Sequence, residues 1–153
     1  MHLNRDAVYR ELLTDDDWAA SVDLRRRCAD AERDAATSRE FDTARALTNR
    51  RITGAGHGKW FGALVDGQLV AQLGLLAAGE RLARFQSVET DPDFRRRGLA
   101  ASLIHHAGVY SFTELGAKTL VIVADPAYVA INLYRVLGFE TTETQLLVER
   151  GPA

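Results

Sequence analysis

An arginine-rich loop between a predicted strand and a predicted helix carries the residues best suited to bind an anion. The strand pattern ends at Asp91-Pro92, because proline cannot donate to a strand ladder, and helical spacing of apolar residues begins at Leu99. Free backbone N–H groups at a helix start bind phosphate, and small residues there allow close approach. The alternative is a solvated run of charge before an ordinary helix. The predicted phosphate site consists of Arg95, Arg96, Arg97, Gly98, Leu99 and Ala100.

A second motif follows the loop after a predicted buried strand. Residues 130–139 read Ala-Ile-x-Leu-Tyr-x-x-x-Gly-Phe, with helical spacing up to a glycine placed to end the helix. The order of strand, Arg-x-x-Gly-x-Ala, helix, strand and this second motif resembles the GNAT superfamily of acyl-CoA-dependent N-acyltransferases. The resemblance covers residues 60–149 in element order and is most specific over 88–100 and 130–139.

The resemblance implies a role for each matching residue. Backbone amides of residues 95–100 would cradle the pyrophosphate of acetyl-CoA, the implied co-substrate, and Val88 and Thr90 would bind its pantetheine arm through the backbone. Tyr134 would stand near the thioester sulfur. A phenol has a pKa of about 10, so it stays protonated at neutral pH and can donate to a departing thiolate. The alternative is that Tyr134 only packs the helix.

A general base is not evident from the resemblance. Many relatives carry a Glu or His in the strand before the phosphate loop, or a Glu in the next strand, whereas this chain has Arg84 or Gln86, and Ile122, at the corresponding positions. The nearest carboxylates are those of Glu89 and Asp125. Strand alternation could turn Glu89 away from the amine, and a water chain or an already neutral amine remain alternatives.

The remaining pattern indicates the elements that position these residues. Asp66-Gly67 between two apolar runs predicts a hairpin with a type I′ turn. We expect helices over about 16 to the low thirties, 38–54, 99–115 and 130–137, and strands over 59–65, 68–76, 82–90, 119–124 and 145–149. The first helix begins at acids suited to an N-terminus, Asp15 to Asp17.

This order predicts a single α/β domain over residues 1–153. The resemblance specifies a GNAT-like fold, with a central mixed, mostly antiparallel sheet, splayed parallel strands and helices on both faces. No internal repeat or second domain is visible in the sequence.

Composition excludes several classes of partner. The chain has 153 residues, 46% hydrophobic and 26% charged, with a formal net charge of −2, so it lacks the positive field that nucleic-acid or membrane binding requires. A lone cysteine, Cys28, forms no disulfide framework, and no Cys/His cluster has metal-ligand spacing. We therefore expect a cytoplasmic protein without a metal, and a homodimer is the working hypothesis for its assembly.

The sequence thus predicts an N-acetyltransferase that acylates a small-molecule amine by direct transfer in a ternary complex. Antibiotics, polyamines, amino acids and protein amino termini are all compatible acceptors. We expect the amine to enter between the first helices and the final strands, opposite the arginine loop. Two alternatives are a non-catalytic acyl-CoA-binding regulatory module and an interaction scaffold that binds no CoA.

Overall fold

The computed structural model describes residues 3–29, 35–125, 127 and 130–145. The described residues divide into two compact parts, one ending at Val123 and one beginning at Ala124. The first part holds the sheet and three α-helices. The second holds the short helix α4 (Ala130–Val136).

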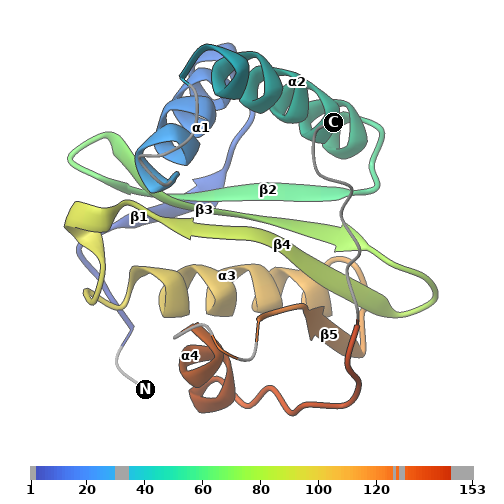
Figure 1. Ribbon diagram of the computed structural model, residues 1–153. Helices are drawn as coiled ribbons and strands as arrows, with labels where there is room; N and C mark the ends of the chain where they lie inside the picture. The colour runs from blue at the N-terminus through green and yellow to red at the C-terminus, as the bar shows by residue number, and fades with distance from the viewer. Residues whose placement is uncertain (1–2, 30–34, 126, 128–129, 146–153) are drawn as a thin grey trace. The chain divides into compact units, whose positions relative to one another are not determined.

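The first part is built on one five-stranded sheet whose strands lie in chain order (Figure 1). Neighbouring strands pair antiparallel except β4 and β5, which are parallel. The mixed, mostly antiparallel sheet predicted from the sequence is therefore confirmed. The strands are β1 (Val8–Glu11), β2 (Gly58–Val65), β3 (Gln68–Ala77), β4 (Leu82–Thr90) and β5 (Thr119–Ile122).

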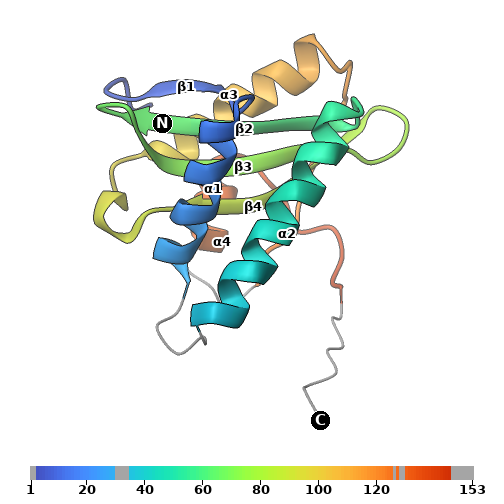
Figure 2. The ribbon, with the colours of Figure 1, turned by 90° about the horizontal axis from the view of Figure 1, so that it is seen from above.

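Helices cover both faces of this sheet. Helices α1 (Asp15–Cys28) and α2 (Ala35–Gly54) lie across one face, as the view from above shows (Figure 2). Helix α3 (Leu99–Thr113) covers the other face (Figure 1). A 3₁₀ turn, η1 (Pro92–Phe94), lies between β4 and α3. This arrangement leaves the end of β4 directly before the start of α3.

The turn between β2 and β3 has the predicted conformation. Asp66 and Gly67 have φ angles of 49° and 80°. Positive φ at both central residues is the requirement of a type I′ turn, whose twist matches that of the flanking strands. The hairpin prediction is confirmed.

The start of α1 differs in detail from the expectation. Its N-cap is Thr14, whose hydroxyl accepts a hydrogen bond from the N–H of Asp17 at 3.1 Å. The Asp17 carboxylate accepts in return from the N–H of Thr14, and Arg10 forms an ion pair with it at 2.7 Å. The Arg10 hydrogen bond, the main cause, holds the pKa of Asp17 well below its usual range. The capping box thus fixes the start of α1, and the Arg10–Asp17 ion pair ties this start to β1.

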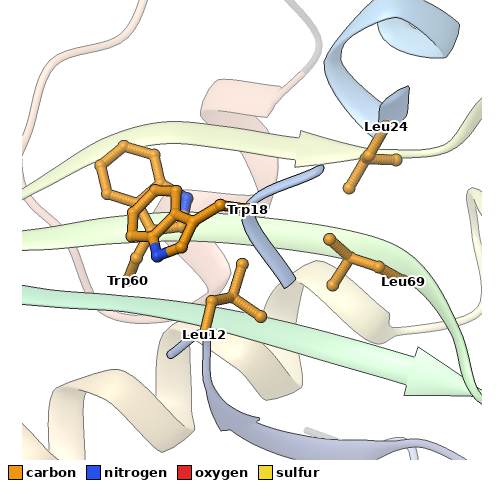
Figure 3. Packing of buried hydrophobic residues seen from close by; sticks show 5 residues of the cluster. All are labelled: Leu12, Trp18, Leu24, Trp60 and Leu69. Carbon is orange, nitrogen blue, oxygen red and sulfur yellow. The ribbon is translucent and has the colours of Figure 1, made fainter. Parts of the chain in front are cut away.

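A hydrophobic cluster lies between α1 and the sheet (Figure 3). The rings of Trp18 and Trp60 have centroids 6.0 Å apart, within the range of favourable aromatic pairs. Trp60 is 1% exposed and needs the space that Gly74 leaves on the neighbouring strand. The cluster consists of Leu12, Trp18, Leu24, Trp60 and Leu69.

Several element boundaries differ from those predicted. Strand β1 was not predicted, because its four residues show little alternation in burial. Helix α1 begins at Asp15 and ends at Cys28, α3 ends at Thr113 rather than residue 115, and β5 ends at Ile122 rather than residue 124. Of the strand expected over 145–149, residues 146–149 lie outside the described residues.

Gly74→Ala is expected to lower the free energy of unfolding by about 1–3 kcal/mol, because the added methyl group overlaps the buried Trp60 ring. Urea unfolding followed by tryptophan fluorescence measures the change. Gly54→Ala is the matched control, since no atom lies within 4 Å of the new methyl group at the end of α2. Equal stability of the Gly74→Ala variant and the wild type would contradict the packing described here.

Candidate functional site

The loop between β4 and α3 presents a helix N-terminus without a side-chain cap. Gly98 is the N-cap of α3, with φ 75° and ψ 4°, and no side chain caps the helix there. The first backbone N–H groups of any α-helix lack partners within the helix. At Leu99 and Ala100 they are therefore available to an anion, and the helix dipole favours negative charge at this point.

The arginine side chains brace the loop. The Nε of Arg95 donates to the carbonyl oxygen of Thr90 at 3.2 Å. Arg97 donates to the carbonyl oxygen of Asp93 at 3.0 Å, and its guanidinium lies 4.7 Å from the Phe94 ring centroid. These contacts tie two of the three arginines to the backbone between β4 and α3.

A largely buried carboxylate anchors the loop at its beginning. Asp91 is 3% exposed and pairs with the Nε of Arg27 of α1 at 2.6 Å. The same guanidinium donates to the carbonyl oxygen of Leu69 at 3.0 Å. The other carboxylate oxygen of Asp91 accepts from the N–H of Asp93 at 3.1 Å. Helix α1 and strand β3 thus hold the point where the chain leaves β4.

The last residues of β4 have no parallel partner in the described part of the chain. Pairing with β5 stops at Phe85 and Ile122, whereas β4 continues to Thr90. Ser87, with φ 49°, coincides with a register shift against β3. A bulge of this kind bends the strand and changes its direction. Residues 86–90 therefore offer an open backbone edge that leads to the loop.

The direction of the backbone groups can be followed at Thr90. The N–H of Asp91 donates to the carbonyl oxygen of Val70 on β3 at 2.9 Å. Because N–H direction alternates along a strand, the N–H of Thr90 points away from β3, toward the open edge. Val88 lies two residues earlier, directly after the bulge. An extended ligand along this edge would meet both residues before reaching the loop.

Glu89 faces α1 and is held there by two partners. One carboxylate oxygen pairs with Arg25 of α1 at 3.0 Å, and the other accepts from Nε2 of Gln72 on β3 at 2.6 Å. Burial raises the pKa of the Glu89 carboxyl, while Arg25 and Gln72 act in the opposite direction. The side chain is 20% exposed, so a solute can still reach it.

Two further candidates belong to the second part of the structure. Tyr134 lies on α4 and packs edge-to-face against Phe139, with ring centroids 6.2 Å apart. The exposed Asp125 accepts a hydrogen bond from the N–H of Ala127 at 2.8 Å. The first part brings Val88, Glu89, Thr90 and the loop 95–100 together at one end of β4, and the roles of Tyr134 and Asp125 stay predictions.

Sequence reasoning missed the partners of Glu89. Gln72 stands in the middle of an otherwise largely apolar strand and is fully buried, and a polar residue in such a run was the available signal. Arg25 belongs to a basic last turn of α1, which gave no reason to single it out. Their positions beside Glu89 depend on how α1 packs on the sheet.

The sequence profile of the acetyltransferase (GNAT) family matches residues 18–139. The chain belongs to this family. The search of curated proteins finds no match. The GNAT assignment agrees with the described fold, including the parallel β4–β5 pair of a mostly antiparallel sheet.

Solved structures of other acetyltransferases share this GNAT fold at low sequence identity. Aminoglycoside N-acetyltransferase AAC(6')-Iy, in complex with the bisubstrate analog CoA-S-monomethyl-acetylneamine, is 18% identical, with a TM-score of 0.74 over 95% of this chain and 99% of that one. A Trypanosoma brucei acetyltransferase is 20% identical, with a TM-score of 0.71 over 95% and 100%. The ribosomal-protein-S18-alanine N-acetyltransferase of Escherichia coli is 22% identical, with a TM-score of 0.68 over 90% and 79%.

Among the described residues, no group of three or more His, Cys, Asp or Glu side chains is arranged to hold a metal ion. In the same ranges, none of the helices has the length and apolar character needed to cross a membrane.

Gly98→Glu is expected to abolish the rise in melting temperature that CoA produces, because it adds a negative side chain where the phosphate would bind. A ligand at 100 times its Kd stabilises the native state by about 2.7 kcal/mol, which differential scanning fluorimetry detects. Gly116→Glu is the control: Gly116 also has a positive φ, 61°, but lies beyond the opposite end of α3. A CoA-induced shift that survives in Gly98→Glu would exclude the loop as the phosphate site.

Proposed function

We propose that the protein is an N-acetyltransferase that moves the acetyl group of acetyl-CoA to an amine of a small-molecule acceptor. One observation carries the proposal: the open edge of β4 runs directly into an uncapped helix N-terminus. The two features suit the two halves of CoA. The extended pantetheine arm would bind along residues 88–90 like an added strand, and the pyrophosphate would bind the N–H groups of residues 98–100.

Glu89 is the proposed general base. It faces the sheet side covered by α1 and α2, which is the side from which we expect the amine to enter. Desolvation raises its pKa, which makes its carboxylate a better proton acceptor at neutral pH. Its partial exposure leaves room for contact with the amine, directly or through one water molecule.

The proposed reaction is a direct transfer within a ternary complex. The amine nitrogen attacks the thioester carbonyl carbon, and its proton passes to Glu89. Backbone N–H groups at the open edge of β4 stabilise the negative charge that develops on the carbonyl oxygen. The carbon–sulfur bond then breaks, and the thiolate of CoA takes a proton from the phenol of Tyr134. After the products leave, Glu89 gives its proton to solvent and the Tyr134 phenolate takes one from solvent, which restores both groups.

A small-molecule acceptor is proposed on the basis of the relatives. The AAC(6')-Iy structure holds an analog that joins CoA to an aminoglycoside-like group, whereas the Escherichia coli enzyme is named for an alanine of a ribosomal protein. The two acceptors share an amine as the reacting group.

The single Cys28 is half-buried and free, and fits the proposal of a reducing, cytoplasmic setting.

The alternative is a regulatory module that binds acyl-CoA without turnover. A solved structure described as a transcriptional regulator from Bacillus halodurans has the same fold, with a TM-score of 0.72 and 18% identity. The two functions differ in one observable. An enzyme releases free CoA thiol with at least one amine in a panel of aminoglycosides, polyamines and amino acids, whereas a binding module gains thermal stability from CoA and releases none.

Glu89→Gln is expected to lower kcat by about 10²-fold or more, because the amide cannot accept the proton. In the wild type, kcat/KM should rise as pH rises through the pKa of Glu89. This rise, the acid limb of the pH profile, should disappear in the variant. Thiol release across pH measures both effects. Glu80→Gln, at an exposed turn residue, is the matched control. An unchanged pH profile in Glu89→Gln would remove Glu89 from the mechanism.

Tyr134→Phe is expected to lower kcat by about 10²-fold while the affinity for CoA stays nearly the same, since a general acid contributes at the chemical step. Thiol release gives kcat, and titration calorimetry gives the Kd of CoA. Tyr110→Phe on α3 is the control for loss of a phenol elsewhere. Full activity of Tyr134→Phe would show that the phenol serves packing alone.

A further inference from the structure

A buried glutamine connects the proposed base to the core of the protein. Gln72 lies in the middle of β3 and is 0% exposed. Its Oε1 accepts from the hydroxyl of Ser21 at 2.5 Å and from Nε1 of Trp60 at 3.3 Å. Its Nε2 donates to the carbonyl oxygen of Ser21 at 3.2 Å and to Oε2 of Glu89 at 2.6 Å. The whole amide is therefore satisfied, as a buried polar group requires.

These contacts leave the Gln72 amide only one orientation. A flipped amide would point an N–H group at the indole N–H of Trp60 and would turn its oxygen toward two acceptors, the carbonyl oxygen of Ser21 and the carboxylate of Glu89. The indole N–H of Trp60 is donor only, and the Trp60 ring is fixed by the cluster around it. The amide nitrogen must therefore face Glu89.

Arg25 is the second residue that holds the Glu89 carboxylate in place. It pairs with Oε1 at 3.0 Å, while Gln72 binds Oε2. Each carboxylate oxygen can accept two hydrogen bonds and makes one with a described residue, so within the described part of the chain one acceptor site on each oxygen remains for an amine or a water molecule. The carboxylate is thus held from α1 and from β3 and keeps free capacity to accept a proton.

We propose that Gln72 is a positioning residue for acetyl transfer: it fixes the Glu89 carboxylate, and Ser21 and Trp60 in turn fix the Gln72 amide. The proposal rests on the role of Glu89 as base in the proposed function. It differs from a purely structural role, because a donor to the carboxylate also favours the charged, proton-accepting form. Gln72 would then influence both the geometry and the protonation of the base.

Other charged or titratable groups also face Glu89, and they stay unchanged in the test. They are Arg25 and Cys28 from α1 and Asp42 and Arg45 from α2. Burial, the main cause, raises the pKa of the Cys28 thiol to about 11. The thiol is therefore neutral in the pH range where the base titrates, and it does not obscure the measurement.

Gln72→Met is the decisive variant, since methionine has a similar length and volume but no N–H donor. We expect kcat to fall by about 10-fold, the KM for acetyl-CoA to stay within about twofold, and the acid limb of kcat/KM to move to higher pH. Ser21→Ala and Trp60→Phe should shift the limb in the same direction by less. Gln68→Met, at the exposed first residue of β3, should change nothing.

The outcomes separate the two proposals. We first consider folded Gln72→Met, assayed below its melting temperature. An unchanged kcat and an unchanged pH dependence of kcat/KM on the acid side would overturn the role of Gln72. Thiol release by this variant would leave the enzyme assignment standing. If Gln72→Met does not fold, the other two variants decide. An acid limb of kcat/KM that stays at the wild-type pH in both Ser21→Ala and Trp60→Phe would overturn the role of Gln72. Absence of thiol release by the wild type with every amine would overturn the proposed enzyme function. Titration of ¹³C-labelled glutamate by NMR, in the wild type and in Gln72→Met, then decides the role of Gln72 separately: an equal pKa of Glu89 in both proteins would overturn it.

Discussion

The ion pair between Arg27 and Asp91 fixes the direction in which the chain leaves β4, and the candidate site depends on that direction. Asp91 is nearly buried, so its charge requires a partner, and Arg27 supplies one while its own side chain stays 39% exposed and screened by solvent. The pair joins the end of α1 to the beginning of the loop. With this point held, the open edge of β4 continues into the N-terminus of α3, and one extended ligand can span both.

The polar network around Gln72 is the second constraint. Burial of an amide and a carboxylate beside the tryptophan cluster is costly unless every donor and acceptor is paired. Ser21, Trp60 and Arg25 supply the pairs, and they come from α1 and β2. The packing of α1 on the sheet therefore contributes to the hydrophobic core and also sets the orientation and the pKa of Glu89.

Much of the fold follows from local pattern, because the strongest signals are short-range. The Asp66-Gly67 turn, the strand that ends at Asp91-Pro92 and the helix that begins at Leu99 each depend on backbone preferences of adjacent residues. Strand β1 escaped prediction because it is a short strand that pairs with β2, which begins at Gly58, far along the chain. Its pairing is a non-local interaction, which the pattern of four residues alone does not predict.

The sequence by itself determined the family and predicted a phosphate-binding loop with the residues that flank it, because these lie together in one continuous segment and a helix start favours anions. Only the tertiary structure decided which way Glu89 points and which residues hold it. Gln72 and Arg25 are 17 and 64 positions away from Glu89 in the chain, and they meet it because β3 pairs with β4 and α1 crosses the sheet. Contacts of this kind depend on packing between elements, which local sequence pattern does not encode.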